Sequence, residues 1–183
     1  NYSMPYAIEF WPAHGDTTNG EAWDLAPYVD ENQNNIYDPE NGDYPCIKGD
    51  LAKFIMFNDW RSAFGLSPMK IEVHLMAYAY QTNDHINNSI FLEYKIYNRS
   101  AQSYEDIYVG KMLDFDLGCP SDDFIGSDSI QNLFYTYNGD NFDQDCFSTI
   151  LGYGTNPGAI GVVVLNQKLH SFINYVNAGS GAA

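Results

Sequence analysis

Residues 30–45 read DENQNNIYDPENGDYP and carry oxygen-bearing side chains at alternate positions. Asp30, Asn32 and Asn34 have the D-x-N-x-N spacing of calcium-binding loops, and Asp38 fills the ninth position of such a loop. Calcium binds about six to eight oxygen atoms, which a short chain can supply only from a tightly curled loop. The spacing therefore predicts a Ca²⁺ site in this loop.

The rest of the loop departs from the EF-hand pattern. Asn35 stands where EF-hand loops place Gly, and Asn tolerates a left-handed turn better than most residues. The twelfth position holds Asn41 instead of Glu and no helical pattern flanks the loop, so Glu40 or Asp43 would have to contribute through a different curl. An Asx-rich surface turn without a metal is the alternative interpretation. The expected ligands are the side chains of Asp30, Asn32, Asn34, Asp38 and Asp43 and the backbone carbonyl of Ile36.

A second acidic cluster lies in LDFDLGCPSDDFIGSD, residues 113–128. Asp114 and Asp116 end an expected strand on one side of it, and Asp122 and Asp123 follow after a loop that contains Gly and Pro. Carboxylates this close together either bind a cation or raise one another's pKa. We expect a second metal site at these four residues, and the alternative is a solvated loop that covers the sheet edge. The patch NGDNFDQD, residues 138–145, is typical of a hairpin turn.

The charge balance agrees with cation binding. The chain has 183 residues and a formal net charge of −16, from 24 acidic and 8 basic side chains. Nucleic acids and anionic membranes need Lys and Arg, so this composition disfavours both as partners. The sequence contains no apolar segment that approaches the roughly 20 residues needed for membrane insertion.

Three cysteines, Cys46, Cys119 and Cys146, lie in loop-like surroundings beside Pro, Gly or Asp. Such cysteines are typical of exported proteins, in which disulfides persist. We expect a Cys119–Cys146 disulfide with Cys46 left over, and three free thiols are the alternative.

Alternation of apolar and polar residues dominates the chain and predicts strands. The clearest strand is KIEVHLMAYAYQ, residues 70–81, followed by strands over residues 89–100 and 104–116 in an expected three-stranded meander. In the first strand, the side chains expected to face the core are Ile71, Val73, Leu75, Ala77 and Ala79, while Glu72, His74, Met76, Tyr78 and Tyr80 point the other way.

Further strands are expected at residues 6–11, 51–58, 132–138 and 158–166. This number of short strands joined by Gly, Asp and Asn turns predicts an all-β fold, an antiparallel β-sandwich of the jelly-roll or Ig type with long acidic loops. The expected organisation is an N-terminal strand or lead-in segment over residues 1–22, a sandwich domain over 23–176, and a linker or frayed end over 177–183.

Catalytic signals are weak. Glu72 and Glu93 are expected on adjacent strands with His74 nearby, but an exposed sheet with Lys95 as a cross-strand partner accounts for the same positions. The four histidines have no zinc-ligand spacing, so we expect a protein that is not an enzyme. An aromatic face formed by Tyr78, Tyr80, Tyr97 and Tyr108 would suit stacking on sugar rings, whereas packing of these side chains between layers is the commoner arrangement.

The strings DENQNNIYDPENGDYPCIKGD, IEVHLMAYAY, FLEYKIYNRS, MLDFDLGCPSDDFIGSD and YNGD occur in this order. In this order they resemble a β-rich region of large secreted Bacteroidetes cell-surface proteins, which are exported by the type IX secretion system and carry a C-terminal sorting domain. The resemblance covers about residues 23–161. It implies a multidomain protein at or beyond the outer membrane, and it implies no activity.

Together these observations lead us to expect a non-catalytic, extracellular structural or adhesive module of a larger surface protein, rigidified by calcium. Its partners would be neighbouring domains of the same protein or other surface proteins. The alternative is a carbohydrate-binding module, or an accessory domain of a secreted glycoside hydrolase, with glycans as partners.

Overall fold

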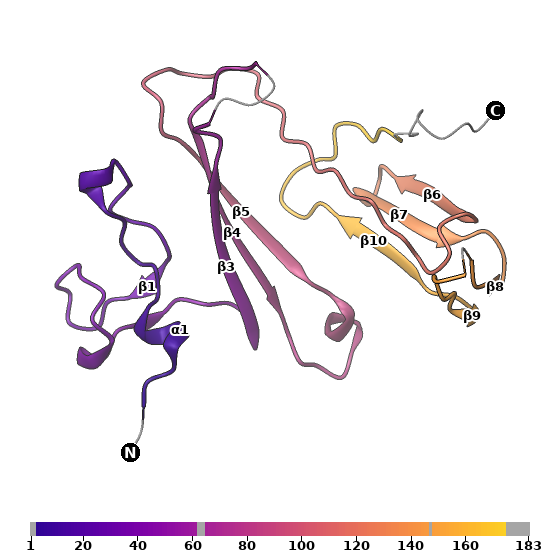
Figure 1. Cartoon of the computed structure of the whole chain (residues 1–183), viewed down its shortest axis with the longest axis horizontal. Coiled ribbons are helices and arrows are strands. Elements are labelled where there is room, and N and C mark those ends of the chain that lie inside the picture. Colours follow the sequence, from indigo (N-terminus) through magenta and orange to yellow (C-terminus); the bar gives the residue numbers. More distant parts are fainter. Residues whose placement is uncertain (1–2, 62–64, 147, 175–183) are drawn as a thin grey trace. The chain divides into compact units, whose positions relative to one another are not determined.

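The computed structural model of the chain describes residues 3–61, 65–146 and 148–174. The chain divides into two compact units, Asn1–Asp106 and Ile107–Ala183. Both units are built on antiparallel sheets, so the predicted all-β class is confirmed (Figure 1). The face-to-face packing of two sheets as a sandwich stays a prediction, as does a single domain over 23–176. The linker expected over 177–183 lies outside the described residues.

The first unit contains a three-stranded sheet in the order β3-β4-β5 and a small two-stranded ribbon, β1-β2. Its elements are α1 (Tyr6–Glu9), η1 (Thr17–Asn19), β1 (Tyr28–Val29), η2 (Pro39–Asn41), β2 (Tyr44–Pro45), β3 (Leu51–Asn58), β4 (Ile71–Ala79), η3 (His85–Asn88) and β5 (Phe91–Asn98). None of the helices in the described part of the chain has the length and apolar character needed to cross a bilayer.

The second unit contains a three-stranded sheet in the order β10-β7-β6 and a two-stranded ribbon, β8-β9. Every strand pair in both units is antiparallel. The elements of this unit are β6 (Asp123–Asp128), β7 (Leu133–Asn138), β8 (Phe142–Asp143), β9 (Gly154–Thr155) and β10 (Ala159–Val163).

Two expected strands are wrong. Residues 6–11 begin with the short helix α1, because the carbonyl of Pro5 accepts hydrogen bonds from the N–H groups of Ile8 and Glu9. Residues 104–116 form no strand, because they cross the boundary between the two units. The alternating apolar residues of that segment have no sheet to pack on, and β3 takes its place as the third strand of the meander. The strands expected at 51–58, 70–81, 89–100, 132–138 and 158–166 are confirmed as β3, β4, β5, β7 and β10.

The face of β4 that was expected to be buried is the more exposed one. Glu72, His74 and Met76 are buried, at 7%, 3% and 7% exposure. The N-terminal segment covers this side of the sheet, since Trp11 packs against Phe54 at 5.8 Å between ring centroids. The N-terminal segment contributes the aromatic ring of Trp11, which can cover polar and apolar side chains alike. The alternation of apolar and polar residues therefore predicts the wrong face of β4 as the buried one.

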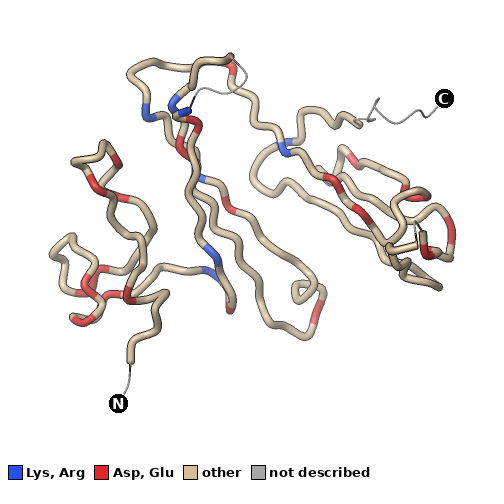
Figure 2. Tube along the Cα trace, in the orientation of Figure 1, with Lys and Arg blue, Asp and Glu red and all other residues tan. Residues whose placement is uncertain are grey.

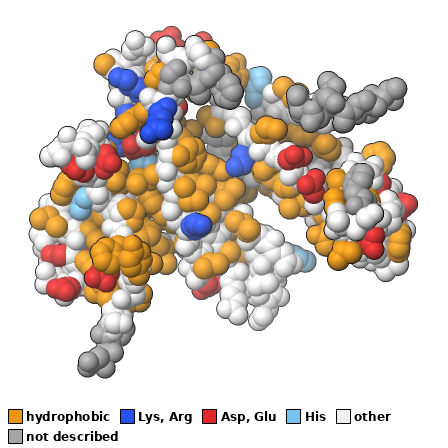
Figure 3. Space-filling view, viewed as in Figure 1, with side chains coloured by type: hydrophobic (Ala, Val, Ile, Leu, Met, Phe, Trp, Pro, Cys, Tyr) orange, Lys and Arg blue, Asp and Glu red, His pale blue; other side chains and the backbone are white. Residues whose placement is uncertain are grey.

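The opposite face of the same sheet is apolar and open to solvent. Register pairs Ile55 with Leu75 and Tyr94, and Phe57 with Val73 and Ile96, so these side chains share one face. Figure 3 shows hydrophobic side chains gathered over this sheet. The exposed members of this face are Ile55, Phe57, Leu92, Tyr94 and Ile96.

The covered face holds a buried charged network. The carboxylate of Glu72 accepts hydrogen bonds from Arg99 Nη2 at 2.7 Å and Nε at 3.2 Å, and lies 2.9 Å from His74 Nε2. Burial raises the pKa of Glu72, but the hydrogen bonds from Arg99 and His74 outweigh it, so the pKa lies below its usual value. Tyr97 lies over the Arg99 guanidinium at 4.8 Å and packs against His74 at 4.6 Å.

Replacing Arg99 by Met should destabilise the protein by about 3 kcal/mol at pH 7, because it leaves the Glu72 carboxylate buried without a compensating charge. The folded pKa of Glu72 is depressed, so its stabilisation is present above the unfolded carboxyl pKa of about 4.3 and is lost as pH falls through the folded value. Urea unfolding at pH 7 and at pH 3 should therefore show a smaller difference between wild type and Arg99→Met at the lower pH. Lys95→Met removes a positive charge from β5, which ends just before Arg99, and should stay within about 0.5 kcal/mol of wild type at both pH values. Equal losses in the two variants would contradict the assignment.

Candidate functional site

The acidic loop of the first unit connects the two strands of the β1-β2 ribbon. Pairing of Tyr28 with Pro45 and of Val29 with Tyr44 brings the two ends of the loop together. Asp43 is 3% exposed and clamps the loop from within. Its Oδ1 accepts the N–H of Glu31 at 2.9 Å and its Oδ2 accepts the N–H of Asp38 at 2.9 Å.

The D-x-N-x-N segment curls around its own side-chain oxygens. Asp30 accepts the N–H groups of Asn34 at 3.2 Å and of Asn35 at 2.8 Å. Asn34 Oδ1 in turn accepts the N–H of Ile36 at 2.7 Å. Asn35 has φ of 60°, so the left-handed turn predicted at this position is confirmed. The segment is therefore a tightly curled turn held by its own Asp and Asn side chains, and calcium binding there stays a prediction.

Asp38 is the centre of this loop. Its carboxylate accepts hydrogen bonds from the side-chain amides of Asn32 at 3.0 Å, Asn34 at 2.9 Å and Asn41 at 3.0 Å. These hydrogen bonds, with that from Asn41 the largest contribution, hold the pKa of Asp38 below its usual value against a smaller opposing effect of desolvation. The carboxylate consequently stays ionised down to a lower pH.

The structure thus brings the side chains of Asp30, Asn32, Asn34, Asp38 and Asp43 into one hydrogen-bonded loop. Ile36 joins them through its backbone, while its side chain is 53% exposed. Within the described residues, no three His, Cys, Asp or Glu side chains are grouped so that they could hold a metal by themselves. Calcium loops also draw on amide and carbonyl oxygens, so Asp and Asn side chains are of the type that this ion binds. In this structure the Asn32, Asn34 and Asn41 amides present N–H groups to Asp38, and these amides would have to turn to bind the ion through oxygen. Figure 2 shows acidic residues but no Lys or Arg in these N-terminal loops, and further acidic residues in the second unit.

One residue that supports the loop was missed in the sequence. His14 Nε2 accepts the N–H of Tyr37 at 3.0 Å, and its ring stacks on Trp23 at 4.1 Å between centroids. The contact joins residues 23 positions apart, and no short-range spacing in the sequence indicates it.

The second predicted cluster is only partly brought together. Asp114 and Asp116 are exposed in the loop before β6, and the strand expected to carry them is absent from the described chain. Asp122 and Asp123 are half-buried at the start of β6. Asp123 Oδ2 accepts the N–H of Leu117 at 3.0 Å, and Asp122 Oδ2 accepts Gln144 Nε2 at 3.1 Å.

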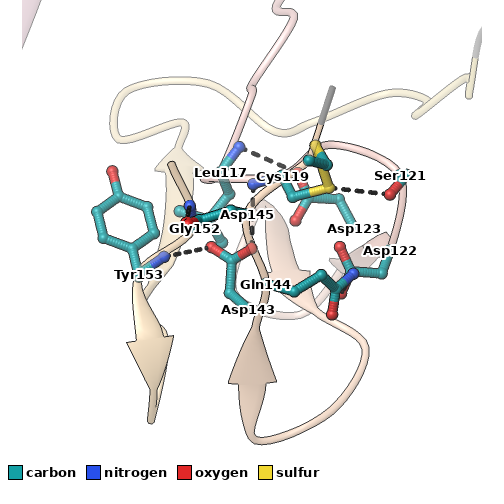
Figure 4. Close-up of a disulfide and its surroundings, with 11 residues drawn as sticks. Leu117, Cys119, Ser121, Asp122, Asp123, Asp143, Gln144, Asp145, Gly152 and Tyr153 are labelled. Carbon is teal, nitrogen blue, oxygen red and sulfur yellow. Dashed lines mark hydrogen bonds between the residues drawn. A yellow bond between two sulfur atoms is a disulfide. The ribbon is translucent and has the colours of Figure 1, made fainter. Parts of the chain in front are cut away.

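The expected Cys119–Cys146 disulfide is present and lies beside this cluster (Figure 4). The buried carboxylate of Asp143 holds the same region together. Its Oδ1 accepts the N–H of Cys119 at 3.0 Å and its Oδ2 accepts the N–H of Tyr153 at 2.8 Å. Gly118, at φ of 70°, is required here because a Cβ would fall 1.8 Å from Asp143 Oδ2. The sequence of residues 138–145 predicts a hairpin turn, and nothing in it indicates that the Asp143 carboxylate is buried.

Negative charge accumulates around Asp123. Burial raises the pKa of Asp123, the hydrogen bond from Leu117 opposes this, and the neighbouring carboxylates of Asp122, Asp143 and Asp116 raise it further. The second unit carries eight Asp and only two Lys in the sequence. A bound cation would remove this unfavourable field.

The first unit also contains a hollow of about 260 Å³ on the covered side of its sheet. Phe54, Tyr97 and the ion-paired Lys48 and Glu93 are among its lining residues. Glu72, which was considered with Glu93 as a carboxylate pair, is instead bound by Arg99. Each carboxylate therefore has a cation of its own.

The four tyrosines considered as a sugar-stacking face do not form one surface in the first unit. Tyr78 and Tyr80 cluster with Phe91 at 5.3 and 5.8 Å, and Tyr97 packs on His74. Tyr108 belongs to the second unit, where it contacts His170.

Comparisons with protein-family models, with curated proteins and with solved structures find no match to this chain.

Replacing Cys119 and Cys146 together by Ala should lower the free energy of unfolding by about 3–4 kcal/mol on the chain-entropy model, since the bridge closes a loop with a sequence separation of 27 residues. Chemical denaturation of wild type and variant measures this difference. Cys46→Ala is the matched control and should change stability little, because Cys46 is a free, exposed thiol. An equal loss in the control would show that thiol removal, and not the bridge, causes the effect.

Proposed function

We propose that this chain is a non-catalytic, extracellular structural or adhesive module of a larger surface protein, and that Ca²⁺ rigidifies it at the loop from Asp30 to Asp43. The carrying observation is the loop itself, in which Asp30 organises the D-x-N-x-N turn and the amides of Asn32, Asn34 and Asn41 gather around the Asp38 carboxylate. A cation bound there would offset the repulsion among these carboxylates and hold β1 and β2 in register. A calcium concentration of the order of millimolar, usual outside cells, suits loops of the weaker extracellular kind.

Two further observations support an extracellular module. The disulfide between Cys119 and Cys146 is of a kind that persists in oxidising compartments. The exposed apolar face of the β3-β4-β5 sheet offers a surface for a neighbouring domain of the same protein or for another surface protein. Export by a type IX route in Bacteroidetes is part of the same proposal and rests on the resemblance of residues 23–161.

Calcium should raise the melting temperature, and chelator should lower it by several degrees, because an ion that binds only the folded state stabilises by about 2.7 kcal/mol at a hundredfold excess over its dissociation constant. The double variant Asp30→Ala/Asp38→Ala should lose most of this response. Glu31→Gln/Glu40→Gln removes the same number of charges from the same loop and should keep it, since neither side chain contributes a hydrogen bond to the loop centre among the described contacts. If chelator still lowers the melting temperature of the Asp30→Ala/Asp38→Ala variant, the ion binds at a different site.

A carbohydrate-binding module is the second candidate, and the hollow beside Phe54 and Tyr97 is the observation that favours it. Aromatic rings beside charged groups can stack on a sugar and bind its hydroxyls. Glycan-array binding that is lost in Tyr97→Ala and kept in Tyr108→Ala would establish this function. Silence across the array would favour the structural role.

A further inference from the structure

The ends of β6 and β7 in the second unit hold side-chain oxygens that lack hydrogen-bond donors. Asp123 of β6 is the cross-strand partner of Asn138 of β7, and Asp122 directly precedes β6. In each of these three residues the Oδ1 atom is buried and has no hydrogen-bond partner in the described structure. Asn138 as a whole is only 6% exposed.

The second polar atom of each side chain fixes these oxygens in place. Asp123 Oδ2 accepts the N–H of Leu117, Asp122 Oδ2 accepts Gln144 Nε2, and Asn138 Nδ2 donates to the carbonyl of Asp140 at 3.1 Å. Rotating the Asn138 amide by half a turn would not help, because its Oδ1 would then face the Asp140 carbonyl and lose that hydrogen bond. The hydrogen bond to the Asp140 carbonyl therefore fixes the orientation of the Asn138 amide, with its Oδ1 left without a donor.

Most buried polar atoms in native proteins have hydrogen-bond partners, so a water molecule or an ion is the expected partner of these three oxygens. All three are acceptors, and the nearby charges of Asp116 and Asp143 add to the negative field. Hard divalent cations prefer this combination of carboxylate and amide oxygens. We propose that Asp122, Asp123 and Asn138 form a second Ca²⁺ site at the start of β6, with their Oδ1 atoms as ligands and water completing the coordination.

This site is independent of the loop between β1 and β2, which belongs to the other unit. It keeps Asp122 and Asp123 from the ligands predicted from the sequence, adds Asn138, and leaves out Asp114 and Asp116. Its role would be to tie the disulfide-bearing loop to the β6-β7 pair, since Leu117 and Gln144 bind the same carboxylates.

Isothermal titration of the intact, oxidised chain with Ca²⁺ tests the proposal. Wild type should bind two ions, and Asp30→Ala/Asp38→Ala should still bind one. Asp123→Asn keeps an acceptor for the Leu117 N–H but removes the charge, and it should weaken the remaining site about tenfold or more. Asp114→Asn removes the same charge from the same unit and should bind as wild type does.

Asn138→Asp provides a readout that misfolding cannot imitate. An added carboxylate should tighten Ca²⁺ binding at this site about tenfold, because affinity follows the charge of the ligands. The variant also loses the hydrogen bond from Asn138 Nδ2 to the Asp140 carbonyl, which lowers stability and cannot itself tighten ion binding. A wild-type chain that binds one ion, lost in Asp30→Ala/Asp38→Ala and unchanged in Asp123→Asn and Asn138→Asp, would overturn the proposal and indicate a buried water at these oxygens. If wild type binds one ion, and this binding is lost in Asp123→Asn but kept in Asp30→Ala/Asp38→Ala, the result would support the site at β6 and refute the proposed Ca²⁺ site in the loop between β1 and β2.

Discussion

Uncompensated negative charge is the constraint on which this structure depends. The described residues bury few hydrophobic side chains, chiefly Ala13, Ala26, Met76, Leu117 and Cys119, while Asp43, Glu72 and Asp143 are buried as well. A core this small contributes little stability by itself. The fold therefore relies on satisfying its carboxylates, and it does so with backbone N–H groups, with Arg99 and, in our account, with calcium.

The carboxylates are satisfied in different ways according to their surroundings. Asp43 and Asp143 each accept hydrogen bonds from two backbone N–H groups, and these bonds hold together segments that are neither helix nor strand. Glu72 is paired with Arg99, which follows β5. Asp38 and Asp123 have no cationic side chain among their hydrogen-bond partners, and these are the positions to which we assign ions.

The sequence predicts the local features well and the long-range ones poorly. The strand over residues 51–58, the left-handed Asn35 and the Cys119–Cys146 bridge follow from alternation, from turn chemistry and from loop surroundings. The face of β4 was misassigned because burial depends on which segment packs on the sheet, and Trp11 lies far from it in sequence. The sequence does not indicate Asn138 as a ligand, because its role comes from its cross-strand pairing with Asp123. The sequence of β6, DFIGSD, lacks the alternation that would predict a strand beside it.

Calcium at the oxygen-rich loop is the claim that the rest of the account depends on most, and anomalous scattering from crystals grown in millimolar calcium tests it most directly. The account predicts a peak about 2.3–2.6 Å from carboxylate oxygens of Asp30 and Asp38, with amide oxygens of the neighbouring Asn side chains turned toward it. A loop without a peak, closed around Asp38 by the same three Asn amide groups, would contradict it.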